Sequence, residues 1–195
     1  MIKAIALGSM ALGAVAVGAA YVWSTSSVET PTYTVQVTNG DIELRNYPAM
    51  TLAQVTRSGS RRSAVQAGFS PLARYIFAKD RTGEKIAMTA PVVQSQLNDE
   101  WTVSFILPAA ITADSAPTPA SDVQVVSQPE RLVAAIRFSG SWSDARFQNA
   151  SQRLLAWVEE QGFGIDGAVE YGYYNDPFTP AFLRRNEVLV PVRAR

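Results

Sequence analysis

Short runs in which apolar and polar residues alternate follow one another along most of the chain, and they predict a domain built mainly of β-strands. Asn39-Gly40 stands between two such runs, 33–38 and 41–46, and both positions of this dipeptide tolerate positive φ. These two runs are therefore expected to form an antiparallel hairpin. Further β-rich runs, each bounded by turn residues, are MTLAQVTRS, EWTVSFILP, DVQVVS, ERLVAAIRFSG, AVEYGYY and EVLVPV.

Two segments carry helical periodicity instead. The first is predicted to begin at Ser70-Pro71, because serine can cap a helix and proline fits its first position, and to run to about Ala78. The second is predicted to begin after Ser143 and to stop at Gly162, which can adopt the left-handed conformation. The buried stripe of the second helix is expected to consist of Phe147, Leu154, Leu155 and Val158.

The chain resembles itself when residues 41–60 are laid over residues 122–141 without a gap. Each copy is followed by a helix and then by two strands. The sequence therefore predicts a domain of two similar strand-strand-helix-strand-strand halves, about 41–108 and 122–193. The segment between them, 109–121, is rich in Ala, Pro and Ser and is expected to be an exposed connection. The identical pairs include Asp41 with Asp122, Pro48 with Pro129, and Ser58-Gly59-Ser60 with Ser139-Gly140-Ser141.

The N-terminal segment, residues 1–23, is apolar with a single basic residue, Lys3, and about 20 such residues suffice to span a bilayer. Two interpretations stay open. Cleavage after Ala20 would make it a signal peptide, whereas Tyr21 and Trp23 at the interface would suit a retained anchor. In both cases the polar linker 24–32 and the domain 33–195 are expected outside the cytoplasmic membrane, in the periplasm or facing outward from it.

The amino-acid composition excludes several classes of function. The chain carries 17 Lys and Arg against 17 Asp and Glu, so no long-range field would recruit nucleic acid or an anionic membrane surface. It has no Cys and no His, which excludes disulfides, thiolate nucleophiles, Ser-His-Asp triads and zinc sites built from imidazole or thiolate. No spacing of carboxylates suggests a paired acid–base site or a metal loop. A binding protein is expected, not an enzyme.

Four motifs then occur in the order found in the SOUL haem-binding proteins, and the chain resembles that family over about residues 33–195. The motifs are IELRNYP, LARYIFAKD, KIAMTAPVV and PFTPAFLRRNEVLVPV. The resemblance implies an α+β fold, a distorted antiparallel β-barrel of two similar halves flanked by two helices. The chain is also similar to the ligand-binding domains of some multidrug-responsive regulators.

The resemblance implies binding of haem or a related tetrapyrrole in an exposed apolar groove, in the role of a carrier or buffer. A histidine ligand to iron is used by some members and is absent here, so recognition of the porphyrin face and propionates is expected. The family groove is associated with the first helix, and Arg74 would meet a propionate. The implied binding residues are Phe69, Leu72, Arg74, Tyr75, Ile76 and Met88.

Other interpretations of these residues stay open. The stripe on the first helix is often simply packed against a sheet, and Met88 is more typical of a core than of an iron ligand. Arg184 and Arg185 would hold propionates or pair with Glu187. Arg61 and Arg62 are expected in solvent, with a propionate as the alternative partner because they lie near the start of the first helix. Pro91 is expected at a bulge or an edge of the barrel. The protein as a whole could also bind another planar apolar ligand, or act as a structural or partner-binding protein.

Overall fold

The structure, a computed structural model, describes residues 28–119 and 122–194 and consists of one antiparallel β-sheet and two α-helices, so the α+β class is confirmed. The apolar segment 1–23 lies outside the described residues. The helices are α2 (Arg61–Ile76) and α3 (Asp144–Glu160), with one 3-10 turn, η1 (Ala181–Leu183). The strands are β1 (Thr34–Asn39), β2 (Ile42–Tyr47), β3 (Met50–Ser58), β4 (Val92–Leu97), β5 (Glu100–Ile106), β6 (Gln124–Gln128), β7 (Arg131–Phe138), β8 (Gly164–Ile165), β9 (Glu170–Tyr173) and β10 (Asn186–Arg193).

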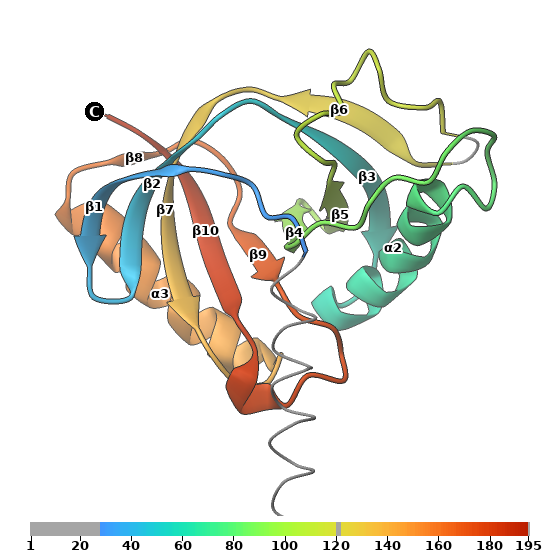
Figure 1. Cartoon of the computed structure of the whole chain (residues 1–195). Helices are drawn as coiled ribbons and strands as arrows, with labels where there is room; N and C mark the ends of the chain where they lie inside the picture. Colours follow the sequence, from blue (N-terminus) through green and yellow to red (C-terminus); the bar gives the residue numbers. More distant parts are fainter. Residues whose placement is uncertain (1–27, 120–121, 195) are drawn as a thin grey trace, which may run out of the picture.

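The sheet is open, so the predicted distorted barrel is not formed, although the antiparallel pairing is as predicted. The strand order is β1-β2-β7-β10-β9-β4-β5-β3-β6, with β8 paired to β10, so β1 and β6 form two unjoined ends. The bent connections from β2 to β3 and from β6 to β7 carry the chain over the top of the molecule, from one half of the sheet to the other (Figure 1). These bends curve the sheet without bringing its end strands together, which closure of a barrel requires.

The strand order has the symmetry that the predicted duplication would produce. In the predicted repeat the counterparts of β2, β3, β4 and β5 are β6, β7, β9 and β10. When each strand is exchanged for its counterpart, the order from β2 to β6 becomes the same order read backwards. A duplication would produce such an order. The duplication itself stays a prediction.

Helix α2 begins nine residues earlier than predicted, at Arg61 (61 against 70). Ser60 is the cap, and its Oγ accepts a hydrogen bond from the Ser63 amide at 3.2 Å. Pro71 lies inside the helix, where it cannot donate to the Ala67 carbonyl. The Arg57 Nε donates to that carbonyl instead, at 3.4 Å. The serine-proline pair therefore resembled a helix start without being one.

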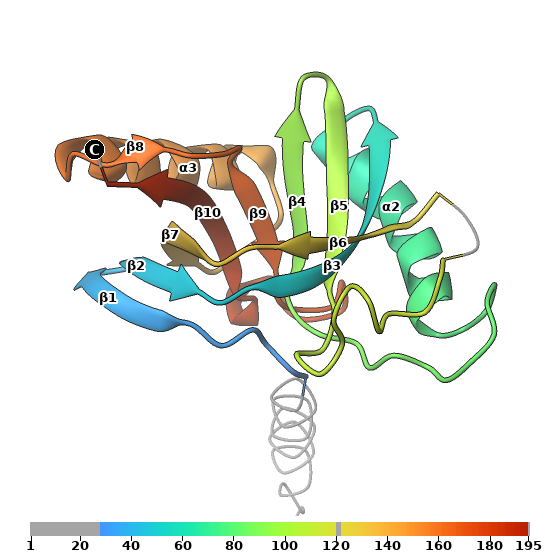
Figure 2. The same cartoon turned by 90° about the horizontal axis from the view of Figure 1, so that it is seen from above.

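Helix α3 begins after Ser143 as predicted, and Gly162 beyond its end has φ +76°. Within the predicted stripe, Phe147, Leu154 and Val158 are buried and Leu155 is half-buried. The two helices cover the sheet at different places, α2 over β3 and β5 and α3 over β7 and β10 (Figure 2). No helix in residues 28–119 and 122–194 is long and apolar enough to cross a bilayer.

The predicted hairpin is present, with Asn39 paired to Ile42 and Gly40 at φ +63° in the turn. Pro91 does not lie at an edge or a bulge, because it directly precedes β4, an interior strand whose pairing begins at Val92. No ladder hydrogen bond is lost there, since Pro91 is outside the ladder. Within the predicted linker, Glu29 already pairs with Thr89 and accepts the Ala90 amide at 2.9 Å.

Candidate ligand-binding site

A buried ion-pair cluster lies on the face of the sheet that α3 does not cover. Alternate residues of β2, β7 and β10 face α3 and form the main core, and the residues between them point the opposite way. On that second face Arg45 of β2 makes a bidentate contact with Glu187 of β10, with Nη1–Oε2 at 2.8 Å and Nη2–Oε1 at 3.1 Å. Arg185 Nη2 lies 2.8 Å from Glu187 Oε1, and the Tyr174 hydroxyl donates to Oε2 at 2.8 Å. All hydrogen-bonding positions of this carboxylate face a donor.

The cluster keeps Glu187 ionised. Burial by itself would raise the pKa of the carboxyl group, but the hydrogen bonds and charges of Arg45 and Arg185 outweigh burial and hold the pKa below its ordinary value. The pKa of Tyr174 is raised, first by burial and then by the negative charge of Glu187, so its hydroxyl remains a hydrogen-bond donor. Burial likewise raises the pKa of Tyr47 to about 12. The Tyr47 hydroxyl accepts from Arg45 Nη1 at 3.1 Å.

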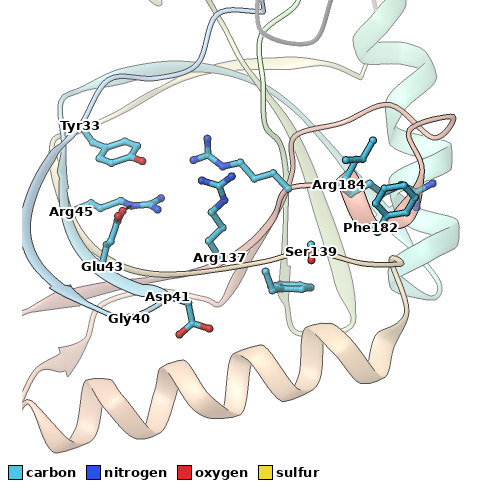
Figure 3. Close-up of a pocket in the computed structure, with 12 residues that line it drawn as sticks. Tyr33, Gly40, Asp41, Glu43, Arg45, Arg137, Ser139, Phe182 and Arg184 are labelled. Atoms are coloured by element: carbon cyan, nitrogen blue, oxygen red, sulfur yellow. Dashed lines mark hydrogen bonds and ion pairs between the residues drawn. The ribbon is translucent and has the colours of Figure 1, made fainter. Parts of the chain in front are cut away.

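A pocket of about 690 Å³ opens above this cluster, and we call it the arginine pocket. Its walls come from the β1–β2 hairpin, the end of β7, and the segment that carries η1 into β10. Tyr33, Arg45 and Arg137 point toward one another inside it (Figure 3). The lining residues are Tyr33, Gly40, Asp41, Glu43, Arg45, Arg137, Phe138, Ser139, Phe182, Leu183, Arg184 and Arg185.

The four arginines of the pocket differ in what they contact. Arg45 donates to Glu43, Glu187 and Tyr47, and Arg185 pairs with Glu187 while lying 3.8 Å over the Tyr174 ring. Arg184 donates to the Thr179 and Pro177 carbonyls, both at 2.8 Å, and stacks on a tryptophan. Arg137 is exposed, and its guanidinium has no hydrogen bond or ion pair among the described residues. Arg137 is therefore the cation most available to an anionic ligand.

One side of the pocket rim is apolar. The Phe182 side chain is 76% exposed and the Leu183 side chain is 49% exposed, although both are large hydrophobic groups. On the opposite wall the Tyr33 ring lies 4.4 Å from the Arg45 guanidinium and packs against Tyr47. The pocket thus combines flat apolar surfaces with guanidinium groups, which suits a ligand that has an apolar face and carboxylates.

The residues predicted from the first helix lie elsewhere. Leu72, Tyr75 and Ile76 are at most 1% exposed and belong to the main core. The Tyr75 hydroxyl donates to the Pro117 carbonyl at 2.7 Å. Close packing explains this burial, because a Cβ added to Gly68 would lie 2.7 Å from Val103. A charged residue at Leu72 would therefore destabilise the fold and would not report on binding.

The other three predicted residues are more accessible but do not gather into one pocket. Phe69 is 43% exposed and meets the Phe105 ring edge-on, with centroids 5.2 Å apart. Arg74 is exposed and its Nε lies 3.4 Å from Asp80. Met88 is half-buried and packs against the main core. A binding role for these residues stays a prediction, and the arginine pocket contains none of them.

Arg61 is buried, contrary to the expectation that it is solvated, whereas Arg62 is exposed. Its guanidinium donates to Asp144 at 2.8 Å, to the Tyr173 hydroxyl at 2.6 Å and to the Trp142 carbonyl at 2.8 Å. It also lies 4.4 Å over the Phe147 ring. These contacts compensate for burial of the charge and join the start of α2 to the start of α3.

The Arg184-Arg185-Asn186-Glu187 motif is accounted for largely by structure. Arg185 and Glu187 pair as the sequence favoured. Asn186 accepts from the Trp142 indole at 2.8 Å and donates to the Gly140 carbonyl at 3.1 Å. The sequence did not single out Arg137, Tyr33 or Phe182. Arg137 could have been found only from its position directly opposite Glu187 in the sheet. That position is known only when β7 has been paired with β10.

Comparison with known proteins defines the class. Residues 28–191 match the family described as SOUL heme-binding protein. The chain belongs to this family. Among its relatives are heme-binding protein 2 of Homo sapiens, 31% identical over 158 residues, and heme-binding protein 2 of Mus musculus, 30% identical over 158 residues. Each alignment covers 76% of this chain and 77% of the relative.

Similar solved structures include the crystal structure of the EcmrR C-terminal domain, with 12% identity, a TM-score of 0.60, and coverage of 84% of this chain and 99% of that chain. A crystal structure of a hydrolase from Listeria innocua has 17% identity, a TM-score of 0.54, and coverage of 81% of this chain and 94% of that chain. At these identities the likeness concerns the fold alone.

Proposed function

We propose that this protein binds haem or a related tetrapyrrole in the arginine pocket. The observation that carries the proposal is the combination, in one pocket of about 690 Å³, of an available guanidinium at Arg137 with exposed apolar side chains at Phe182 and Leu183. Pockets for small molecules commonly measure about 300–1,000 Å³. Membership of a family described as heme-binding, and relatives named heme-binding protein 2, support the choice of ligand.

The pocket chemistry assigns a role to each wall. The flat tetrapyrrole face would lie against Phe182, Leu183 and the Tyr33 ring, which removes apolar surface from water. A propionate would meet Arg137, whose guanidinium can form two parallel hydrogen bonds to a carboxylate. Arg45 and Arg185 are held by Glu187 and would contribute positive potential.

Iron contributes little to recognition in this proposal. The chain has no histidine or cysteine to ligate it. A tyrosinate ligand is disfavoured because burial raises the pKa of Tyr75, Tyr173 and Tyr174. Binding of the porphyrin face and its carboxylates therefore supports a carrier or buffer, with no catalytic step, acting outside the cytoplasmic membrane if the N-terminal segment directs export.

Titration of the full chain in detergent with hemin, iron-free protoporphyrin and a porphyrin dimethyl ester tests the proposal. Hemin and protoporphyrin should bind with similar affinity, and the ester should bind at least about tenfold more weakly, since each lost charge-assisted contact is worth about 1.5 kcal/mol or more. No binding of either acid contradicts the proposal. Binding of the ester alone would favour another planar apolar ligand.

Two arginine variants locate the site. Arg137→Glu should weaken hemin binding at least about tenfold, because it replaces attraction to a propionate by repulsion. Arg74→Glu is the matched control, since Arg74 is also exposed but lies on α2 and outside the arginine pocket. Loss of affinity in Arg74→Glu with none in Arg137→Glu would place the ligand on α2, as the sequence predicted.

A further inference from the structure

The loop between β9 and β10 presents large apolar side chains to solvent. We call residues 176–184 the aromatic loop. Phe178 is 90% exposed, Phe182 is 76% exposed and Leu183 is 49% exposed. The loop is the red segment below the sheet in Figure 1. Single exposed hydrophobic residues are common on protein surfaces, but three in one short loop indicate an interaction site.

Hydrogen bonds hold this loop in shape. Asp176 Oδ1 accepts from the amides of Phe178 and Thr179, at 2.7 and 3.1 Å. Arg184 returns to the loop and donates to the carbonyls of Thr179 and Pro177. The exposed phenylalanines therefore lie on a loop whose backbone conformation is fixed by hydrogen bonds.

Positive charge flanks the aromatic loop. The Gly140 amide donates to the Ala181 carbonyl at 3.0 Å, so the end of β7 lies directly beside η1. A Cβ at Gly140 would lie 3.0 Å from the Arg146 guanidinium, which brings Arg146 to the same place. Arg137 and Arg146 are both exposed, and neither guanidinium has a hydrogen bond or ion pair among the described residues. Two guanidinium groups without a partner among the described residues thus lie beside exposed aromatics in a protein of zero net charge.

The described chain begins close to where this loop leaves the sheet. The Glu29 carbonyl accepts the Ala90 amide, and the neighbouring Pro91 ring would contact a Cβ at Gly172, 3.5 Å away. Gly172 lies in β9, whose last residue, Tyr173, leads into the loop. Because Glu29 is already fixed to the domain, a membrane segment at 1–23 would join it near the loop through about 5 residues, 24–28, which reach at most about 18 Å.

We propose that the aromatic loop docks on a lipid surface, with Phe178 and Phe182 inserted at the interface and Arg137 and Arg146 facing anionic headgroups. Exposed aromatic side chains flanked by cations are typical of interfacial membrane contact. Attraction is short-range, since the net charge is zero. Phe182 and Arg137 also line the arginine pocket, so lipid and tetrapyrrole would share these two side chains, whereas Phe178 and Arg146 belong to the lipid contact alone. Docking would bring the mouth of the pocket to the lipid, where an apolar ligand concentrates.

Single-cysteine labelling tests the contact, because the chain has no cysteine of its own. The full chain carrying Phe178→Cys would be labelled with nitrobenzoxadiazole and reconstituted into vesicles of phosphatidylcholine and phosphatidylglycerol. Leu97→Cys is the matched control: Leu97 is 70% exposed and lies at the far end of β4 from the Val92–Tyr173 pairing. The label at 178 should shift to shorter wavelength and be quenched by nitroxide lipids. The label at 97 should do neither.

Three results would overturn the contact: equal behaviour of the two labels, no response at 178, or protection at 178 that disappears when chains are diluted among vesicles. The last would indicate a second copy as the partner. Arg146→Glu should reduce the shift at 178, and so should pure phosphatidylcholine. Hemin affinity of Phe178→Ser in detergent should equal that of the parent protein, because Phe178 does not line the pocket. Failure of lipid docking and failure of tetrapyrrole binding are thereby distinguished.

Discussion

Arg45 and Glu187 lie 142 residues apart in the sequence and form a bidentate ion pair with side chains that are 2% and 0% exposed. The pair joins β2 to β10 across the intervening strand β7. Two charges so far from water are stable only if each is fully paired, and here Tyr174, Arg185, Glu43 and Tyr47 complete the pairing. The floor of the arginine pocket is therefore a rigid part of the fold.

Removal of one partner should be costly. Arg45→Ala leaves Glu187 buried beside a single remaining guanidinium, and we expect the free energy of unfolding to fall by about 3–5 kcal/mol. Urea denaturation measures it. Arg153→Ala is the control, because the Arg153–Asp41 pair has the same geometry at 2.8 Å but is 51% and 40% exposed, and its loss should cost at most about 1 kcal/mol. Equal losses in the two variants would contradict a special role for burial.

The contribution of Glu187 should depend on pH. Its pKa in the folded protein is lower than in the unfolded chain, because Arg45 and Arg185 outweigh the effect of burial. The stabilisation is therefore fully present above the unfolded pKa, which is near 4.5, and is lost as the pH falls through the folded pKa. Unfolding free energies of the parent and of Glu187→Gln, measured from neutral to acid pH, should converge at the acid end. A difference that stays constant with pH would show that the carboxylate charge contributes nothing.

Arg61 and Arg62 provide a paired test of burial. Arg61→Ala should lower the free energy of unfolding by about 3 kcal/mol, because it leaves the Tyr173 hydroxyl and the Trp142 carbonyl without their donor. Arg62→Ala should change it by less than about 0.5 kcal/mol, since Arg62 is exposed. Chemical denaturation with near-ultraviolet circular dichroism, which reports the Trp142 environment, measures both. An unchanged free energy of unfolding in Arg61→Ala would mean that water replaces the contacts of Arg61.

These residues show what the sequence could and could not predict. The hairpin at Asn39-Gly40, strand β3 and helix α3 follow local patterns, and each was predicted within a residue or two. The start of α2 was missed because its first turn, Arg61 to Ser63, is polar and resembles a loop, whereas Ser70-Pro71 resembles a cap. Local pattern is informative only where local preference decides the structure.

Properties that depend on distant pairing were not predictable. Closure of the sheet depends on whether β1 meets β6, which no alternation pattern encodes. Burial of Arg61 depends on Asp144 and Tyr173, which reach it only after α2 and α3 have docked. Arg137 became a candidate only through its neighbours in the folded sheet. The apolar stripe of α2 was recognised correctly, but sequence alone does not distinguish a stripe packed on a sheet from one that lines a groove.

The packing of α2 provides the last test. A Cβ at Gly68 would lie 2.7 Å from Val103 Cγ2 and 3.2 Å from Val55 Cγ2, so the helix backbone rests directly on the sheet. Gly68→Ala should therefore destabilise the protein by about 1–3 kcal/mol in urea denaturation, whereas the exposed control Gln66→Ala should be nearly neutral. Because the arginine pocket lies elsewhere, folded Gly68→Ala should keep the hemin affinity of the parent protein. A parallel loss of affinity in Gly68→Ala and in Phe69→Ser would instead show that tetrapyrrole binds along α2.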